Sequence, residues 1–185
     1  AAQDQIRYIN CRLETTAALM ASAEAKLTGR LAVCTATSGP GIVHMLNGLA
    51  DAAQDRAPVL AITGQVERKK LGTGSKQDLN QQVMIEPLAV YSALTADARV
   101  LPVQLNLAMK KSISMGGVAH LSIPKDVWMD GVHGELYPPM APQSAPPPPE
   151  HELQRAIEIL KSWACPVILA GRGVKGCERE LLQLA

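Results

Sequence analysis

Short apolar runs alternate along the chain with longer segments in which apolar residues recur at helical spacing. The runs predict strands at residues 6–9, 31–35, 59–63, 90–94, 118–123 and 167–170. The longer segments predict helices at residues 13–27, 42–53, 101–113 and 152–160. The run at 31–35 shows no polar alternation, which is typical of a strand buried on both faces. The pattern therefore predicts an α/β fold with three layers, α/β/α, around a mainly parallel sheet.

The segment 130–150 contains seven of the 13 prolines and shows neither a helical nor a strand period. It is predicted to be an extended linker. The linker would join a domain of residues 1–129 to the start of a second α/β domain at residues 151–185. The elements after the linker are too few to enclose a core, so the second domain is expected to be truncated. Nothing precedes 6–9 to pair with it, so the first domain is expected to lack its first βα unit.

The composition narrows the class of partner. A formal net charge of +1 gives no electrostatic basis for nucleic acid or a membrane as the main partner. No apolar stretch approaches the ~20 residues that would cross a bilayer. The four cysteines are scattered without metal-ligand spacing, so we expect no metal site and a reduced, cytoplasmic setting.

Three features follow one another in a fixed order between residues 12 and 65. Glu14 opens the first predicted helix, a Gly-Pro-Gly turn at 39–41 follows the strand at 31–35, and the strand at 59–63 ends at Gly64. This order resembles the N-terminal pyrimidine-binding domain of thiamine diphosphate-dependent enzymes related to pyruvate oxidase and acetolactate synthase. The resemblance runs from about residue 6 to residue 127, and the segment from 151 resembles the opening of the central domain of that family.

The resemblance implies a catalytic role for Glu14. In the family this carboxyl hydrogen-bonds a ring nitrogen of the aminopyrimidine of the cofactor and promotes the imino tautomer that removes the thiazolium proton. A pocket closed by a partner domain would favour the protonated carboxyl. The resemblance further implies cofactor binding by Thr37, Gly39, Pro40, Gly41, His44 and Gln77.

Local sequence alone also allows simpler interpretations of these residues. Glu14 could be a solvated acid at a helix start, where the dipole favours it. His44 could lie on a helix face without a task, and residues 39–41 could be an ordinary strand-to-helix turn. Two positions depart from the family. Lys76 precedes Gln77 where relatives usually have an aromatic residue, and Leu13 precedes Glu14 where many have histidine, so the substrate stays open.

The resemblance also implies the chemistry of the parent enzyme, which would be a transferase or an oxidoreductase. It would decarboxylate a small 2-oxo acid and then transfer or oxidise the enamine, as a homodimer or homotetramer. Its cofactor would be thiamine diphosphate with Mg²⁺, and FAD is possible in the full-length protein. The Gly-Asp-Gly motif that holds Mg²⁺ and the diphosphate is absent, and Asp126, Asp130 and Glu135 build no octahedral site. We therefore expect the isolated chain to be inactive.

Other classes of function are kept as alternatives. Residues 171–176 read Gly-Arg-Gly-Val-Lys-Gly after a predicted strand, which is typical of a dinucleotide site when an acidic residue follows ~20 positions later. The chain could instead be a non-catalytic oligomerisation module with the same fold. A third alternative is a different thiamine enzyme, such as a lyase or a decarboxylase of a larger 2-oxo acid.

Overall fold

A computed structural model describes residues 6–131 and 146–185 of the chain. Its contacts divide the chain into two units, residues 1–143 and 144–185. The division falls in the proline-rich segment at 130–150, most of which, Glu135 included, lies outside the described residues. The assignment of the two units to particular domains stays a prediction.

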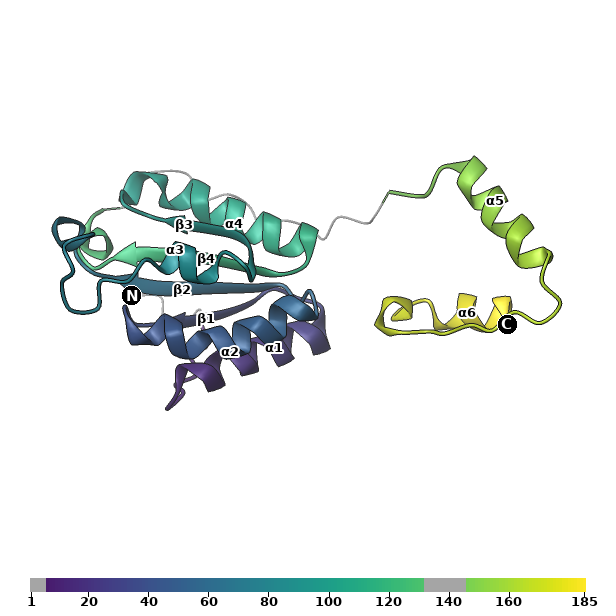
Figure 1. Cartoon of the computed structure of the whole chain (residues 1–185), viewed down its shortest axis with the longest axis horizontal. Coiled ribbons are helices and arrows are strands. Elements are labelled where there is room, and N and C mark those ends of the chain that lie inside the picture. The colour runs from purple at the N-terminus through teal and green to yellow at the C-terminus, as the bar shows by residue number, and fades with distance from the viewer. Residues whose placement is uncertain (1–5, 132–145) are drawn as a thin grey trace. The chain divides into compact units, whose positions relative to one another are not determined.

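Four parallel strands form one sheet in the order β1-β2-β4-β3 (Figure 1). They are β1 (Ala32–Ala36), β2 (Val59–Gln65), β3 (Ala89–Leu94) and β4 (Val118–Pro124). In their register Ala61 of β2 lies between Cys34 of β1 and His120 of β4, and Ser92 of β3 lies on the far side of His120. The four corresponding strand predictions and the parallel sheet are confirmed.

Helices cover both faces of this sheet. They are α1 (Glu14–Thr28), α2 (Pro40–Gln54), α3 (Gln81–Ile85) and α4 (Leu101–Met115). Side chains alternate along β2, so Val59 packs in a buried cluster with Leu49 of α2 and Ile85 of α3, whereas Leu60 packs with Ala108 of α4. Helices α1, α2 and α3 therefore form one outer layer and α4 forms the other, which confirms the three-layer α/β/α fold. The short helix α3 was not predicted.

Helices α1 and α2 run in the same direction and touch along their lengths (Figure 1). Gly48 makes this possible, because a side chain there would begin 2.6 Å from the Cβ of Ala18. Further along, the ammonium of Lys26 lies 2.7 Å from Asp51 and 2.5 Å from Asp55. Both helices consequently begin at the same edge of the sheet.

The strand predicted at 6–9 is wrong. These residues form no strand, and Ile6, Tyr8 and Ile9 are exposed. A strand requires a hydrogen-bonded neighbour, and no described segment pairs with residues 6–9. Apolar character alone was therefore insufficient to form a strand here.

The described part of the second unit, residues 146–185, contains two helices and one helical turn. These are α5 (Glu150–Lys161), the 3₁₀ turn η4 (Arg172–Val174) and α6 (Glu178–Leu184). The helix predicted at 152–160 is confirmed. The strand predicted at 167–170 is wrong, because these residues are irregular and Val167 and Leu169 are 93% and 98% exposed. None of residues 146–185 is buried.

Candidate active site at the carboxyl edge of the sheet

The predicted site residues gather at one edge of the sheet, where its parallel strands end. The turn at 37–41 leaves the carboxyl end of β1, and the loop that carries Gln77 follows the carboxyl end of β2. Helix α1 also begins at this edge, since its last turn leads into the amino end of β1 (Figure 1). Ligands of open α/β sheets bind outside the carboxyl ends of the strands.

Glu14 is the first residue of α1, and its carboxylate pairs with a histidine of α2. Its Oε2 atom lies 3.1 Å from Nδ1 of His44. The pKa of Glu14 is lowered, first by a hydrogen bond from its own backbone amide and then by the hydrogen bond from His44. With 31% of its side chain exposed, Glu14 is an ionised carboxylate that solvent can reach. The protonated form of Glu14 is expected for a pocket that a partner domain closes. That environment differs from the single chain in this structure, so the protonated form stays a prediction.

His44 lies one helical turn after the start of α2, and α1 fixes its backbone. The hydroxyl of Thr15 donates to the carbonyl of His44 at 2.7 Å. This contact and the Glu14 pair bring the start of α1 against the first turns of α2. The His44 ring is half exposed, so it faces the surface and not the core.

The Gly-Pro-Gly turn closes tightly because of its first glycine. Gly39 has a φ of +69°, in the left-handed region that side chains disfavour, and Pro40 is the first residue of α2. A side chain on Gly39 would also begin 2.7 Å from the Cβ of Gln77. Gly39 and Gly41 are buried, whereas Thr37 and Pro40 are exposed.

Gln77 lies against this turn in an uncommon backbone conformation. Its φ is +70°, and the hydroxyl of Ser38 donates to its Oε1 atom at 3.2 Å. Lys76, beside it, is exposed. The structure thus forms two pairs, Glu14 with His44 and Gly39 with Gln77, which the first turn of α2 connects.

A buried polar chain lies under this edge, and sequence reasoning missed it. The ring of His120 lies 2.8 Å from the hydroxyl of Thr63 through Nε2 and 2.9 Å from the hydroxyl of Ser92 through Nδ1. The hydroxyl of Thr63 donates to Gln81 Oε1, and Gln81 Nε2 donates to the carbonyl of Gly64 at 2.8 Å. A histidine inside the apolar run 118–123 was the signal that could have revealed it.

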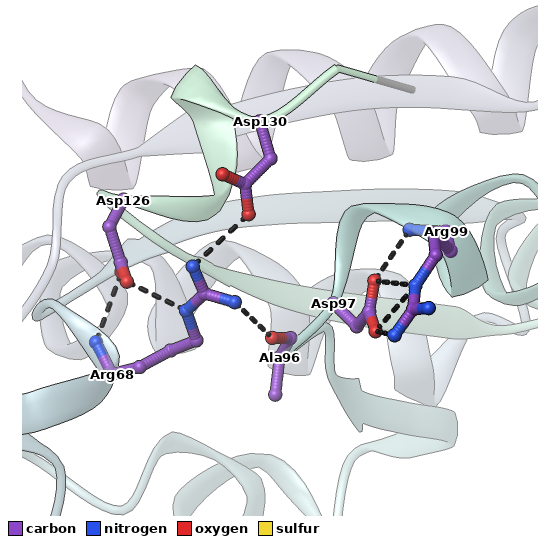
Figure 2. A network of polar contacts seen from close by, with 6 residues as sticks. All are labelled: Arg68, Ala96, Asp97, Arg99, Asp126 and Asp130. Carbon is purple, nitrogen blue, oxygen red and sulfur yellow. Dashed lines mark hydrogen bonds and ion pairs between the residues drawn. The ribbon is translucent and has the colours of Figure 1, made fainter. Parts of the chain in front are cut away.

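The carboxylates of Asp126 and Asp130 are held by a single arginine (Figure 2). Arg68 Nε lies 2.7 Å from Asp126 and Nη2 lies 3.1 Å from Asp130, while Nη1 donates to the carbonyl of Ala96. This network joins the segments that follow β2, β3 and β4. Within residues 6–131 and 146–185, no group of three or more potential metal ligands comes together.

A recess of ≈ 370 Å³ lies beside the loop of Gln77. It is lined by Gln65, Leu71, Gly72, Gly74, Asp78, Leu79, Asn80, Gln82 and Leu94. None of the predicted site residues lines it. Its polar groups are largely engaged with the protein: Gln65 donates to the carbonyl of Leu79, and Asn80 caps α3 through the amide of Val83.

Comparison with known proteins identifies the family. Residues 1–84 match the family described as "Thiamine pyrophosphate enzyme, N-terminal TPP binding domain". The chain carries the N-terminal domain of a thiamine pyrophosphate enzyme. The resemblance seen in the sequence is thereby confirmed, thiamine pyrophosphate being another name for thiamine diphosphate.

Relatives of this thiamine pyrophosphate enzyme domain match along almost its whole length. The chain is 40% identical to the protein YdaP of Bacillus subtilis over 99% of its residues. It is 33% identical to the pyruvate oxidase of Lactiplantibacillus plantarum over 100%, and 32% identical to the large subunit of acetolactate synthase isozyme 1 of Escherichia coli over 98%. The chain spans about a third of the length of each of these proteins. In its described parts, no helix combines the length and apolarity required to span a membrane.

Proposed function

We propose that this thiamine pyrophosphate enzyme domain binds the aminopyrimidine of the cofactor at the edge formed by Glu14, His44, the turn at 37–41 and Gln77. The observation that carries the proposal is the placement of Glu14. It is a solvent-accessible, ionised carboxylate at the carboxyl edge of the sheet, beside a turn of small residues. A carboxylate offers about four acceptor positions, so the His44 contact at Oε2 leaves capacity for a ligand donor.

The residues present suit one half of the cofactor. A pyrimidine is flat and apolar on its faces with polar atoms at its edge, and the turn at 37–41 offers little side-chain bulk beside an acceptor at Glu14. A diphosphate with Mg²⁺ needs oxygen ligands in octahedral geometry, and the described residues bring no such group together. We propose that the domain contributes the pyrimidine half of a site and that another domain of the whole enzyme would supply the Mg²⁺–diphosphate half.

When bound, thiamine pyrophosphate would supply the nucleophilic carbon needed for chemistry at the carbonyl of a 2-oxo acid. Glu14 would hold a proton between its carboxylate and the ring nitrogen, which sets the tautomer of the aminopyrimidine. His44 would orient that carboxylate through the 3.1 Å contact. The turn and Gln77 would exclude water from one side of the ring.

The reaction proposed for the whole enzyme draws on these roles and on the relatives. We propose decarboxylation of a small 2-oxo acid, with transfer or oxidation of the fragment that remains, because two relatives are a pyruvate oxidase and an acetolactate synthase. A homodimer or homotetramer would supply the second half of the site, FAD is an additional candidate cofactor, and the setting would be cytoplasmic. The isolated chain is proposed to be inactive.

The alternative of a nucleotide site at residues 171–176 has less support. The dinucleotide motif functions as a turn between a strand and a helix. Here no strand precedes it, since residues 166–170 are irregular. The alternative of an oligomerisation module has no observation in its favour among the described residues.

The test uses the pyrimidine half alone. We expect 4-amino-5-hydroxymethyl-2-methylpyrimidine, titrated into the chain and followed by NMR, to bind with a Kd on the order of 1 mM. Shifts should concentrate at Glu14, Gly39, Gly41, His44 and Gln77. Replacing the carboxylate in Glu14→Gln should weaken binding at least tenfold.

The matched control is Glu24→Gln, which neutralises an exposed carboxylate of the same helix and should leave binding unchanged. Absence of saturable shifts at these residues, or equal loss in both variants, would overturn the proposed site. Turnover of pyruvate by the isolated chain would contradict its inactivity.

A further inference from the structure

The hydrogen bonds of the buried polar chain have one consistent direction. The single hydroxyl proton of Thr63 goes to Gln81 Oε1, so Thr63 must accept from His120, and Nε2 of the ring carries the proton. His120 Nδ1 is then an acceptor, and the hydroxyl of Ser92 donates a hydrogen bond to it. Gln81 is oriented by the carbonyl of Gly64, which can only accept. These five residues form the relay Ser92 → His120 → Thr63 → Gln81 → Gly64.

Burial makes the relay rigid. Thr63, Gln81 and His120 are each 0% exposed, so water cannot replace a missing partner. Every buried side-chain nitrogen and oxygen of the described residues has a hydrogen-bond partner. Removal of one hydroxyl would leave its neighbours buried without a hydrogen-bond partner, which is unfavourable. The relay therefore has one arrangement, and each member fixes the next.

The relay ends under the candidate active site. A side chain on Gly64 would begin 3.3 Å from the backbone nitrogen of Ser38, so the end of β2 lies directly beneath the turn. Gln81 is the first residue of α3 and lies four positions after Gln77. One end of the relay thus reaches both segments that form the Gly39–Gln77 pair.

We infer that the relay positions the turn at 37–39 and the loop of Gln77, so that His120 and Thr63 are positioning residues for the pyrimidine pocket. The name of the pocket rests on the proposed function, whereas the coupling rests on the hydrogen bonds alone. The relay connects β3, β4 and β2 across one face of the sheet. It holds Gln81 in place at the start of α3, next to the loop of Gln77.

The chain contains a matched control at the opposite edge of the sheet. The hydroxyl of Ser112 is also 0% exposed and donates to the carbonyl of Gly117 at 2.6 Å, near the amino ends of β2 and β4. Ser112→Ala removes a buried hydroxyl, as Thr63→Val does, but at the edge away from the site. A purely structural role for Thr63 predicts the same response in both variants.

The experiment is ¹⁵N relaxation on the complete 185-residue chain without any cofactor. In the wild type we expect backbone order parameters of about 0.8 or more at Ser38, Gly39 and Gln77, which mark rigid backbone. Thr63→Val should lower them below about 0.6. Thr63→Ser, which keeps the hydroxyl, should restore them, and Ser112→Ala should leave them unchanged. The ring of His120 should show the Nε2–H tautomer in the wild type.

Two results would overturn the inference. One is unchanged order in Thr63→Val, and the other is equal loosening in Ser112→Ala. If Thr63→Val does not fold, Ser92→Ala at the far end of the relay decides by the same criterion. The two proposals can fail separately. If the aminopyrimidine does not bind but Thr63→Val alone lowers the order parameters, the proposed function is wrong and the coupling between the relay and the turn still holds.

Discussion

His44 and His120 both lie on the face of the sheet that helices α1, α2 and α3 cover, and they illustrate two different uses of one residue type. His44 is half exposed and pairs with the carboxylate of Glu14. His120 is 0% exposed and has only hydroxyl partners, and burial lowers its pKa to about 4. The exposed pair can exchange partners with a ligand, whereas the buried ring can act only by holding its neighbours in place.

This difference separates chemistry from positioning within one domain. A reactive group must be accessible to a ligand and must be able to exchange its hydrogen-bond partner for that ligand. Glu14 and His44 meet both conditions because they are partly exposed and pair with each other. A positioning group needs permanent partners, which Ser92 and Thr63 provide to His120. Four changes test the contrast, in order of decreasing effect on the free energy of unfolding.

Acid should produce the largest effect, through His120. Its pKa of about 4 in the folded chain lies below the usual 6.5, so the unfolded chain binds more protons between these values. Stability should therefore fall as the pH falls from 6.5 to 4, by about 3 kcal/mol. Urea unfolding at several pH values measures it. His120→Asn should remove most of the slope, and an unchanged slope would exclude His120 as its source.

Gly48→Ala should separate the helices that form the exposed pair. Its new methyl group would begin 2.6 Å from the Cβ of Ala18, so α1 and α2 must move apart. We expect a loss of about 2 kcal/mol in thermal unfolding and a weaker Glu14–His44 contact. The control is Asn47→Ala, a substitution at the exposed residue next to Gly48. It should change the free energy of unfolding by less than about 0.5 kcal/mol.

Ser92→Ala should weaken the buried relay from its far end. The substitution leaves Nδ1 of His120 without its donor, and we expect a cost of about 1 kcal/mol in urea unfolding. The compensated change His120→Leu with Ser92→Ala removes both partners and should cost less than the sum of the two single changes. Strict additivity would show that the two residues are not coupled.

Glu14→Gln should have the smallest effect on stability, below about 0.5 kcal/mol, because exposed ion pairs contribute little. The pKa of Glu14 is lowered in the folded chain, so any contribution is present above pH 4.5 and is lost as the pH falls below it. This window opens at pH 4.5, near the lower end of the window of His120. A ¹³C titration of the carboxylate measures it, and a raised pKa would contradict the ionised state.

The architecture could be predicted from the sequence, because helices and central strands leave strong periodic patterns. The failures at residues 6–9 and 167–170 have one physical cause. A strand requires a second strand to pair with, and the apolar character of a segment does not reveal whether such a partner is present. The site residues Glu14, His44 and Gln77 came from the family resemblance. Their pairing did not, because Glu14 meets His44 only after α1 and α2 pack. The relay was missed because it depends on the register that places Ser92, His120 and Thr63 within reach of one another.

The absence of buried residues from 146–185 has a calorimetric consequence. The heat capacity change of unfolding scales with the surface that becomes exposed, at about 12–15 cal/mol/K per residue. Because every buried residue that the structure describes lies within 6–131, about 125 of the described residues belong to a unit that exposes a core on unfolding. The chain should therefore give about 1.7 kcal/mol/K, whereas 185 packed residues would give about 2.5 kcal/mol/K. The thermogram would be that of a protein about two thirds as long as the chain itself.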